Sequence, residues 1–333
     1  MTKGLDVGTM NITCAKKADD RIRFTQQRNT FVELEHSDIA ERMLERSDVL
    51  HIRHGSHVYI VGEDALNFAN IFNTSTSRPM SAGILSRKEK KAIPMIQLMV
   101  ERLLGKPGSP GETCYFNVPA NPVDDELDTL YHQKTLGSLV ERAGYTPHPI
   151  NEGMSVVYSE LADQKFTGVG ISWGAGMTNV CFAYYAVPVL QFSVARGGDW
   201  IDKQASVATG VPVDKVTARK EKGVNLNWES KIGDLEGALS IYYENLIDYV
   251  VKNLAKEARR KNVEEGLKIP VAITGGTCQP KGFDKLLLEK LRGADLPFEV
   301  DRVIWSDEPI FSVVRGDLVA ALSEDGGEKK SKK

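Results

Sequence analysis

Two segments of the chain each combine a strand-like run, a glycine-rich turn and a second strand-like run. They span residues 4–15 and 170–183, and the second turn is expected to be two residues longer. Turns that lack Cβ atoms can aim several backbone N–H groups at one anion. Two such turns facing each other would therefore clamp a chain of phosphoryl groups. The candidate phosphate-binding residues are Gly8, Thr9, Met10 and Asn11 in the first turn, and Gly174, Ala175, Gly176, Met177 and Thr178 in the second.

A third glycine turn, Gly275-Gly276-Thr277, follows the β-branched run 269–274. A nucleoside can lie flat against such a turn because no side chain intervenes. Taken alone, the motif is also typical of an ordinary strand-to-helix turn. Asp6 stands at the end of the first strand, where its carboxylate would orient a Mg²⁺ ion through water. Together, these residues predict a site for ATP with Mg²⁺.

The elements that must position these turns alternate between short strands and longer amphipathic helices, which predicts an α/β fold. Strands are expected over residues 4–7, 168–172, 179–183 and 269–274. Helices are expected over residues 123–143, 235–261, 282–292 and 309–322. The charged, apolar-free segment 326–333 predicts a disordered tail.

Composition excludes several classes of function. The 42 basic and 45 acidic residues leave a net charge of -3, so no long-range field attracts nucleic acid. The four cysteines are too widely spaced to suggest a zinc site, and His51, His54 and His57 lack a partner ligand at suitable spacing. Without a secretion signal or a long apolar run, the protein is expected to be cytoplasmic, with no direct membrane insertion.

The order of the three glycine turns resembles the actin, Hsp70 and hexokinase superfamily. Within it, residues 6–11 resemble the Asp-x-Gly-Thr-x-Asn turn of the MreB- and MamK-type bacterial actins. The resemblance covers nearly the whole chain. It implies an actin-like fold of the duplicated, ribonuclease H-like kind, with two α/β domains around a nucleotide cleft. Further segments that resemble the family are 78–84, 117–119, 196–202 and 307–316.

The resemblance also implies domain bounds. Domain I would comprise residues 1–150 plus 305–325, with a small inserted subdomain near 29–78. Domain II would comprise residues 151–304, with a small inserted subdomain near 195–265.

The resemblance adds site residues on the far side of the second turn. Gly198 and Asp199 match its Gly-Gly-Asp motif, and Lys220 and Glu221 stand where the family contacts adenine. Glu152 stands where the family positions the water that attacks the terminal phosphate. The alternative for Glu152 is structural, because an acidic residue beside a helix N-terminus also complements the helix dipole.

Ser172 departs from the family pattern, which has Asp at the start of the second turn. A serine hydroxyl can make a hydrogen bond but brings no negative charge to the metal. Met177 likewise replaces a hydroxyl residue. The resemblance therefore implies an ATPase that is weak, converting ATP slowly to ADP and phosphate.

Two functions fit this pattern. The first is a filament-forming cytoskeletal protein whose subunits associate head to tail, with protein partners in a cytoskeletal assembly. The second is a non-polymerising ATP-binding adaptor, like PilM or FtsA, that acts in a membrane-associated assembly; Ser172 favours this alternative. A kinase of the same superfamily would need a carboxylate base over a substrate hydroxyl, and the sequence offers no candidate.

Overall fold

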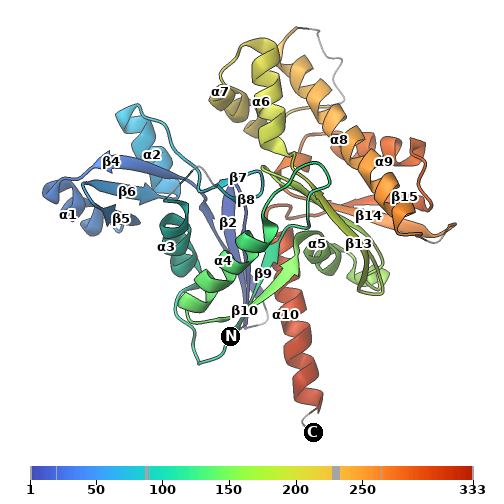
Figure 1. Ribbon diagram of the computed structural model, residues 1–333, viewed down its shortest axis with the longest axis horizontal. Coiled ribbons are helices and arrows are strands. Elements are labelled where there is room, and N and C mark those ends of the chain that lie inside the picture. The colour runs from blue at the N-terminus through green and yellow to red at the C-terminus, as the bar shows by residue number, and fades with distance from the viewer. Residues whose placement is uncertain are drawn as a thin grey trace.

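The computed structural model describes residues 2–19, 21–86, 89, 91–226, 233–263 and 265–331, with side chains to residue 324. Two five-stranded sheets form the centre of the molecule (Figure 1). Residues of both sheets line the pocket described below. No helix in the described ranges is both long and apolar enough to cross a membrane.

The first sheet has the strand order β10-β9-β1-β2-β3. Strand β1 pairs antiparallel with β2 and parallel with β9. Its buried side chains pack against helices α3 and α4 in one apolar core. The elements are β1 (Lys3–Val7), β2 (Asn11–Ala18), β3 (Arg21–Arg28), β9 (Thr113–Val118), β10 (Thr146–Asn151), α3 (Ala92–Leu104) and α4 (Thr129–Arg142).

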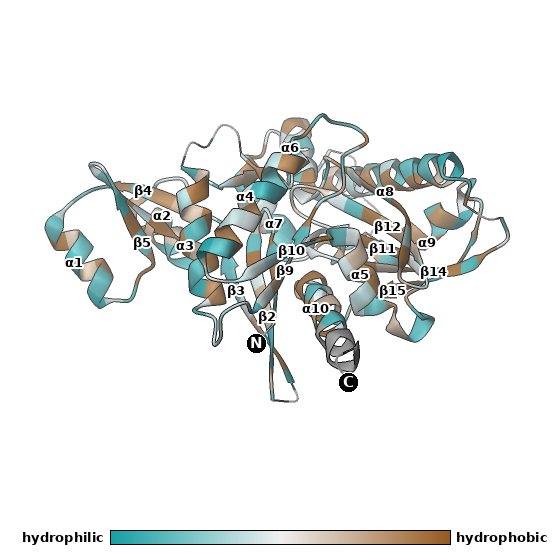
Figure 2. Cartoon of the chain, turned by 60° about the horizontal axis from the view of Figure 1, so that its bottom comes forward, coloured by the Kyte–Doolittle hydropathy of each residue, from teal (hydrophilic) through white to brown (hydrophobic). Residues whose placement is uncertain are grey.

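The second sheet has the strand order β13-β12-β11-β14-β15. It packs against helices α8 and α9 through a larger apolar core, and Figure 2 shows mainly hydrophobic colouring on its strands β11 and β12. The elements are β11 (Gly168–Trp173), β12 (Thr178–Tyr184), β13 (Val187–Val194), β14 (Lys268–Thr274), β15 (Glu299–Trp305), α8 (Leu235–Arg260) and α9 (Phe283–Gly293).

The two sheets have the same topology. In each, the first strand pairs antiparallel with the second and parallel with the fourth, and the fourth pairs parallel with the fifth. The internal repeat predicted from the sequence is therefore a repeat of the fold. One detail of that prediction is wrong, because the innermost paired residues are separated by four residues in both copies: 8–11 lie between Val7 and Ile12, and 174–177 lie between Trp173 and Thr178. The second turn is not longer.

Helices α5 (Glu152–Glu160) and α10 (Ser312–Ser331) pack against each other between the sheets (Figure 1). The two helices approach closely at Gly316, because this residue has no Cβ atom; a Cβ atom there would overlap the backbone of Ser155. Helix α10 also packs on β1 and β9, so the last helix of the chain returns to the first sheet.

Each half also carries an inserted segment. In the first half, a three-stranded sheet β4-β6-β5 with helices α1 and α2 forms its own small apolar core. In the second half the insertion is helical. The elements are β4 (Phe31–Glu35), α1 (Asp38–Arg46), β5 (His51–His54), β6 (His57–Val61), α2 (Glu63–Phe72), the hairpin β7 (Met80–Ser81) and β8 (Ile84–Leu85), α6 (Gly198–Thr209) and α7 (Val213–Glu221); the 3-10 helices are η1 (Ala162–Gln164) and η2 (Gly276–Cys278).

The predicted strands and helices exist, but several bounds differ. Helix α4 begins at Thr129, six residues after the predicted start, because the Asp128 side chain accepts a hydrogen bond from the backbone of Tyr131 and caps the helix there. Helix α10 continues to Ser331, through most of the segment predicted as a disordered tail. Its Glu and Lys residues have high helix propensity. Residues 332–333 of that tail lie outside the described residues.

Candidate functional site

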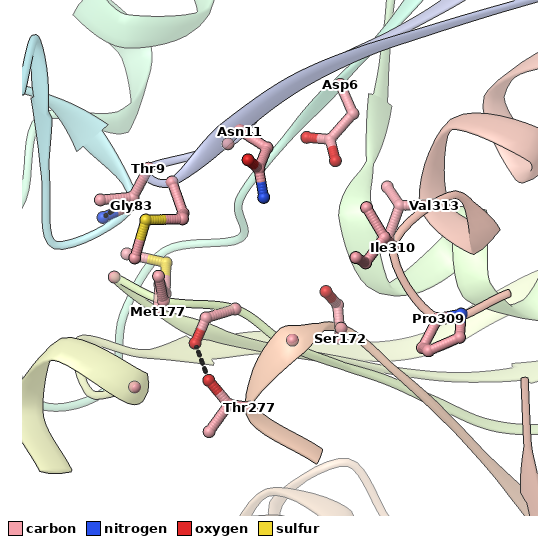
Figure 3. Close-up of a pocket in the computed structure, with 18 of the residues that line it drawn as sticks. Asp6, Thr9, Asn11, Gly83, Ser172, Met177, Thr277, Pro309, Ile310 and Val313 are labelled. Atoms are coloured by element: carbon pink, nitrogen blue, oxygen red, sulfur yellow. Dashed lines mark hydrogen bonds between the residues drawn. The ribbon is translucent and has the colours of Figure 1, made fainter. Parts of the chain in front are cut away.

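A cleft of about 650 Å³ lies between the two halves of the molecule (Figure 3). All three glycine turns contribute to its lining, together with residues from the inserted segments. Among the predicted site residues, the lining includes Asp6, Gly8, Thr9, Met10, Asn11, Glu152, Gly174, Ala175, Gly176, Met177, Gly198, Lys220, Glu221, Gly275, Gly276 and Thr277.

The first and second turns are closed by the same backbone hydrogen bond. The Gly8 N–H donates to the Asn11 carbonyl at 2.9 Å, and the Gly174 N–H donates to the Met177 carbonyl at 3.0 Å. A Cβ atom on either glycine would lie within 3.0 Å of that same carbonyl oxygen. Glycine is therefore required at both positions for the turn to close, before any ligand is considered.

A side chain supports each turn from behind. The Asn29 amide donates to the Gly8 carbonyl at 2.8 Å, and the Thr277 hydroxyl donates to the Gly174 carbonyl at 2.8 Å (Figure 3). Thr277 thus links the third turn to the second. The sequence offered no signal for Asn29, because it lies 21 positions along the chain from its partner.

The two halves touch at one end of the cleft. A Cβ atom on Gly176 would overlap both Thr9 and the backbone of Gly83. The Gly83 N–H donates to the Thr9 hydroxyl at 3.2 Å, and the Met177 side chain packs on Gly83 (Figure 3). The candidate phosphate turns therefore face each other at contact distance, as a clamp requires.

The two glycines of the third turn have different surroundings. Gly275 has a φ of 101°, and a Cβ atom there would overlap the Trp173 carbonyl. Gly276, in contrast, lines the cleft, and apart from its chain neighbours and its own helical turn no heavy atom of the described residues lies within 4 Å of the position its Cβ would take. Gly275 is needed by the backbone, whereas Gly276 leaves room in the cleft.

Glu152 begins α5 and directs its carboxylate into the cleft. The Ser172 hydroxyl donates to its Oε1 at 2.6 Å, and the Asn179 amide donates to its Oε2 at 2.6 Å. Ser193 in turn donates to the Asn179 Oδ1 atom at 2.5 Å. Helix α5 is capped by Asn151, so the structural and the functional interpretations of Glu152 both remain open. Asn179 and Ser193 were not among the predicted site residues.

The carboxyl groups of Asp6 and Glu152, which both line the cleft, have raised pKa values. Burial and, to a smaller extent, the neighbouring Asp6 raise the pKa of Glu152 to about 8, with the bonds from Ser172 and Asn179 opposing the rise. Burial also raises the pKa of Asp6 to about 6, against a lowering by the Asn117 amide. These two acids lie close enough for their negative charges to repel each other. A cation bound beside them would reduce this repulsion.

Lys220, which also lines the cleft, is held in place by two contacts. Its Nζ atom pairs with the buried Asp202 at 2.8 Å and donates to the Gly198 carbonyl at 2.8 Å. The adjacent Glu221 accepts a 3.2 Å hydrogen bond from Arg28 of the first half. This ion pair spans the cleft, and no motif in the sequence predicted it.

Two predicted residues are absent from the cleft lining. The Thr178 hydroxyl is buried in the second sheet and donates to the Arg196 carbonyl at 2.9 Å. Both carboxylate oxygens of Asp199 accept from Arg78, at 2.8 and 2.9 Å. Asp199 therefore connects the two halves through Arg78 rather than facing the cleft.

A Mg²⁺ ion fits the donor set at the Asp6 end of the cleft. Asp6 is a carboxyl group, the kind of oxygen ligand that this ion prefers, and the described lining places no lysine or arginine in contact with it. For ATP, the open space at Gly276 and the facing turns provide a cradle that side chains would otherwise fill.

The Volactin family model matches residues 1–321 of the chain. A MamK double helical filament is similar in structure, with a TM-score of 0.72 and 18% identity over 96% of this chain and 98% of that one. A non-polymerising MamK mutant bound to AMPPNP gives a TM-score of 0.59 and 17% identity over the same shares.

The ethanolamine utilization protein EutJ from Carboxydothermus hydrogenoformans gives a TM-score of 0.54 and 13% identity over 96% of this chain and 89% of that one. No curated protein matches the sequence. These structural matches show that the chain has the actin-like ATPase fold, which confirms the fold predicted from the sequence.

Proposed function

The chain belongs to the Volactin family, and we propose that it is an actin-like protein that binds ATP with Mg²⁺, hydrolyses it slowly and assembles into filaments. The observation that carries the proposal is the pair of identically closed glycine turns, which meet across one cleft beside Asp6. The AMPPNP-bound MamK neighbour supports the choice of an adenine nucleotide.

In this proposal the triphosphate lies between the two turns and the nucleoside lies over Gly276. Lys220 and Glu221 line the end of the cleft where the adenine would sit. The two halves would be domain I (1–150 plus 305–325) and domain II (151–304), with the bounds implied by the sequence. Each five-stranded sheet falls within one of these domains apart from the last residue of β10, Asn151, and the last residue of β15, Trp305.

A bound Mg²⁺ would neutralise phosphate charge, and Asp6 would hold it through water. Glu152 would position the attacking water, since its carboxylate faces the same end of the cleft. Slow hydrolysis is supported by the hydrogen bonds that engage both oxygens of Glu152 and by the lack of charge at Ser172. These two bonds lower the pKa of Glu152 from the value that burial alone would give it, and they hold its carboxylate in one orientation.

Self-association into a head-to-tail polymer is supported by the likeness to a MamK filament. The ion pairs Arg28–Glu221 and Arg78–Asp199 join the halves, so a ligand that strengthens their closure would fix the shape of the subunit. We place such filaments in the cytoplasm, where further proteins of a cytoskeletal assembly would bind them. The non-polymerising adaptor is the second candidate, because the constrained Glu152 suits a protein that uses nucleotide binding without turnover.

The test combines a binding assay with an assembly assay. Isothermal titration should detect MgATP binding, and Gly276→Val should abolish it by filling open space in the cleft. Gly293→Val is the matched control, because Gly293 is also free of neighbours within 4 Å but lies at the end of α9.

Electron microscopy with ATP or a non-hydrolysable analogue should then show filaments for the natural protein and not for the Gly276 variant. Binding without filaments, across salt and crowding conditions, would favour the adaptor. An absence of binding to ATP, ADP and GTP would contradict the nucleotide proposal.

A further inference from the structure

Asp317 on α10 is a fully buried carboxyl group that the site described above does not use. Its Oδ1 atom accepts a 2.5 Å hydrogen bond from the Ser155 hydroxyl. Its Oδ2 atom makes no hydrogen bond of normal geometry to the described residues, although the Asn117 amide is near enough to lower the pKa of Asp317, and none of their lysines or arginines forms an ion pair with it. Buried polar atoms are nearly always bonded, so this oxygen requires an explanation.

The position of Asp317 places it behind Asp6. A Cβ atom on Gly4 would lie 3.1 Å from the Asp317 Cβ atom, so α10 crosses β1 at that residue. Alternate residues of a strand share a face, and Gly4 and Asp6 are therefore on the same side of β1. Val313, one helical turn before Asp317, lines the cleft (Figure 3).

The side chain of Asn117 on β9 connects Asp317 to the cleft. Asn117 is 4% exposed and lines the cleft, and its amide lowers the pKa of both Asp6 and Asp317. Asp6 and Glu152 both raise the pKa of Asp317, after the larger effect of burial. Asp6 of β1 and Asp317 of α10 thus share the Asn117 amide, and Glu152 lies close enough to raise the pKa of Asp317.

We propose that Asp317 is a positioning residue for the divalent cation of the cleft, acting from behind Asp6 through Asn117. Asp317 would provide the cation with a second buried carboxyl group besides Asp6, since Ser172 in the second half has no carboxyl group. The inference rests on the proposed function. Its physical basis is that attraction between a carboxylate and a divalent ion is strong at short range inside a protein, where screening by water is weak. A cation held near Asp6 would reduce the repulsion between Asp6, Glu152 and Asp317.

The experiment measures ATP affinity by isothermal titration in Mg²⁺ and again in EDTA, for the natural protein and for Asp317→Asn. Asparagine keeps the shape of the side chain, and circular dichroism verifies the fold; Asp317→Ser is the second variant. We expect roughly tenfold weaker binding in Mg²⁺ and unchanged binding in EDTA. Asp163→Asn, which removes an exposed carboxylate from η1, is the control and should change neither value.

A double variant sharpens the test. Ser172→Asp combined with Asp317→Asn should recover most of the affinity in Mg²⁺, because it restores a carboxylate on the other side of the cation. Equal losses in both buffers, no loss, or no recovery in the double variant would overturn the inference and leave the proposed function standing. A natural protein that binds ATP in neither buffer would overturn both.

Discussion

In the first half of the molecule, β1 brings Asp6 to the cleft two residues before Gly8. In the second half, β11 brings Ser172 to the corresponding place, two residues before Gly174. The backbones of the two turns are closed by equivalent bonds, yet only the first half carries a charge there. The Ser172 hydroxyl instead donates a hydrogen bond to Glu152.

This difference separates what builds the turn from what gives it chemistry. The turn requires glycine because a Cβ atom would meet the carbonyl that closes it. The residue two positions earlier is under no such restriction, so it can differ between the halves. The duplicated fold therefore supplies two similar frames, and the difference between Asp6 and Ser172 makes the site asymmetric.

The largest expected effect concerns Glu152, which Ser172 and Asn179 of the second half hold and whose pKa Asp6 of the first half raises. Glu152→Gln should slow ATP hydrolysis by at least about 100-fold, because it removes the group that positions water, while ATP affinity changes little. Phosphate release in single-turnover assays measures this. An unchanged rate would show that Glu152 only complements the N-terminus of α5.

The asymmetry itself is tested by paired substitutions. Asp6→Asn should weaken MgATP binding about 30-fold, or about 2 kcal/mol, because it removes the charge that holds the metal's water. Ser172→Ala should weaken it much less. Titration calorimetry of both variants compares them, and losses of equal size would mean that the two turns contribute alike.

Making the second half resemble the first should have a smaller, opposite effect. Ser172→Asp should raise the hydrolysis rate about tenfold, equivalent to about 1.4 kcal/mol of barrier, by adding charge beside the metal and releasing Glu152. Ser172→Ala separates the two causes, since it releases Glu152 without adding charge. A lower rate in the aspartate variant would contradict the expected role of this position.

The smallest effect is the pH dependence of the ligand-free protein. The pKa of Glu152 in the folded state is raised to about 8 from 4.5, so folding favours its protonated form. The stabilisation is complete below pH 4.5 and is lost as the pH rises towards 8. Thermal unfolding should therefore show a Tm that falls by a few degrees between pH 6 and 9. Glu152→Gln should flatten this slope; an equally steep slope in the variant would assign the effect elsewhere.

Much of the fold could be predicted because it depends on local patterns. The alternation of short strands with amphipathic helices, and the repeated glycine turn, predicted an α/β fold in two similar halves. The length of the second turn was predicted wrongly because the two segments were aligned by residue type, which suggested a longer loop. The strand pairing of Trp173 with Thr178 shows that the second turn has the same length as the first.

Most of the candidate site was also predicted, since each glycine turn is a local motif and Asp6 stands two residues before the first one. The exceptions share one cause. Thr178 and Asp199 stand beside the correct motif, but their side chains are directed to Arg196 and Arg78 by the packing of distant elements.

The sequence by itself determined the turns, the alternation of elements and the residue types at their ends, because backbone sterics and hydrophobic periodicity act over a few residues. Only the tertiary structure decided which groups meet. It brought Asp317 behind Asp6 from more than 300 positions away, and it tied Ser172 to Glu152. Such encounters follow from how helices pack between two sheets, and burial there, rather than residue type, sets the pKa values of the acids.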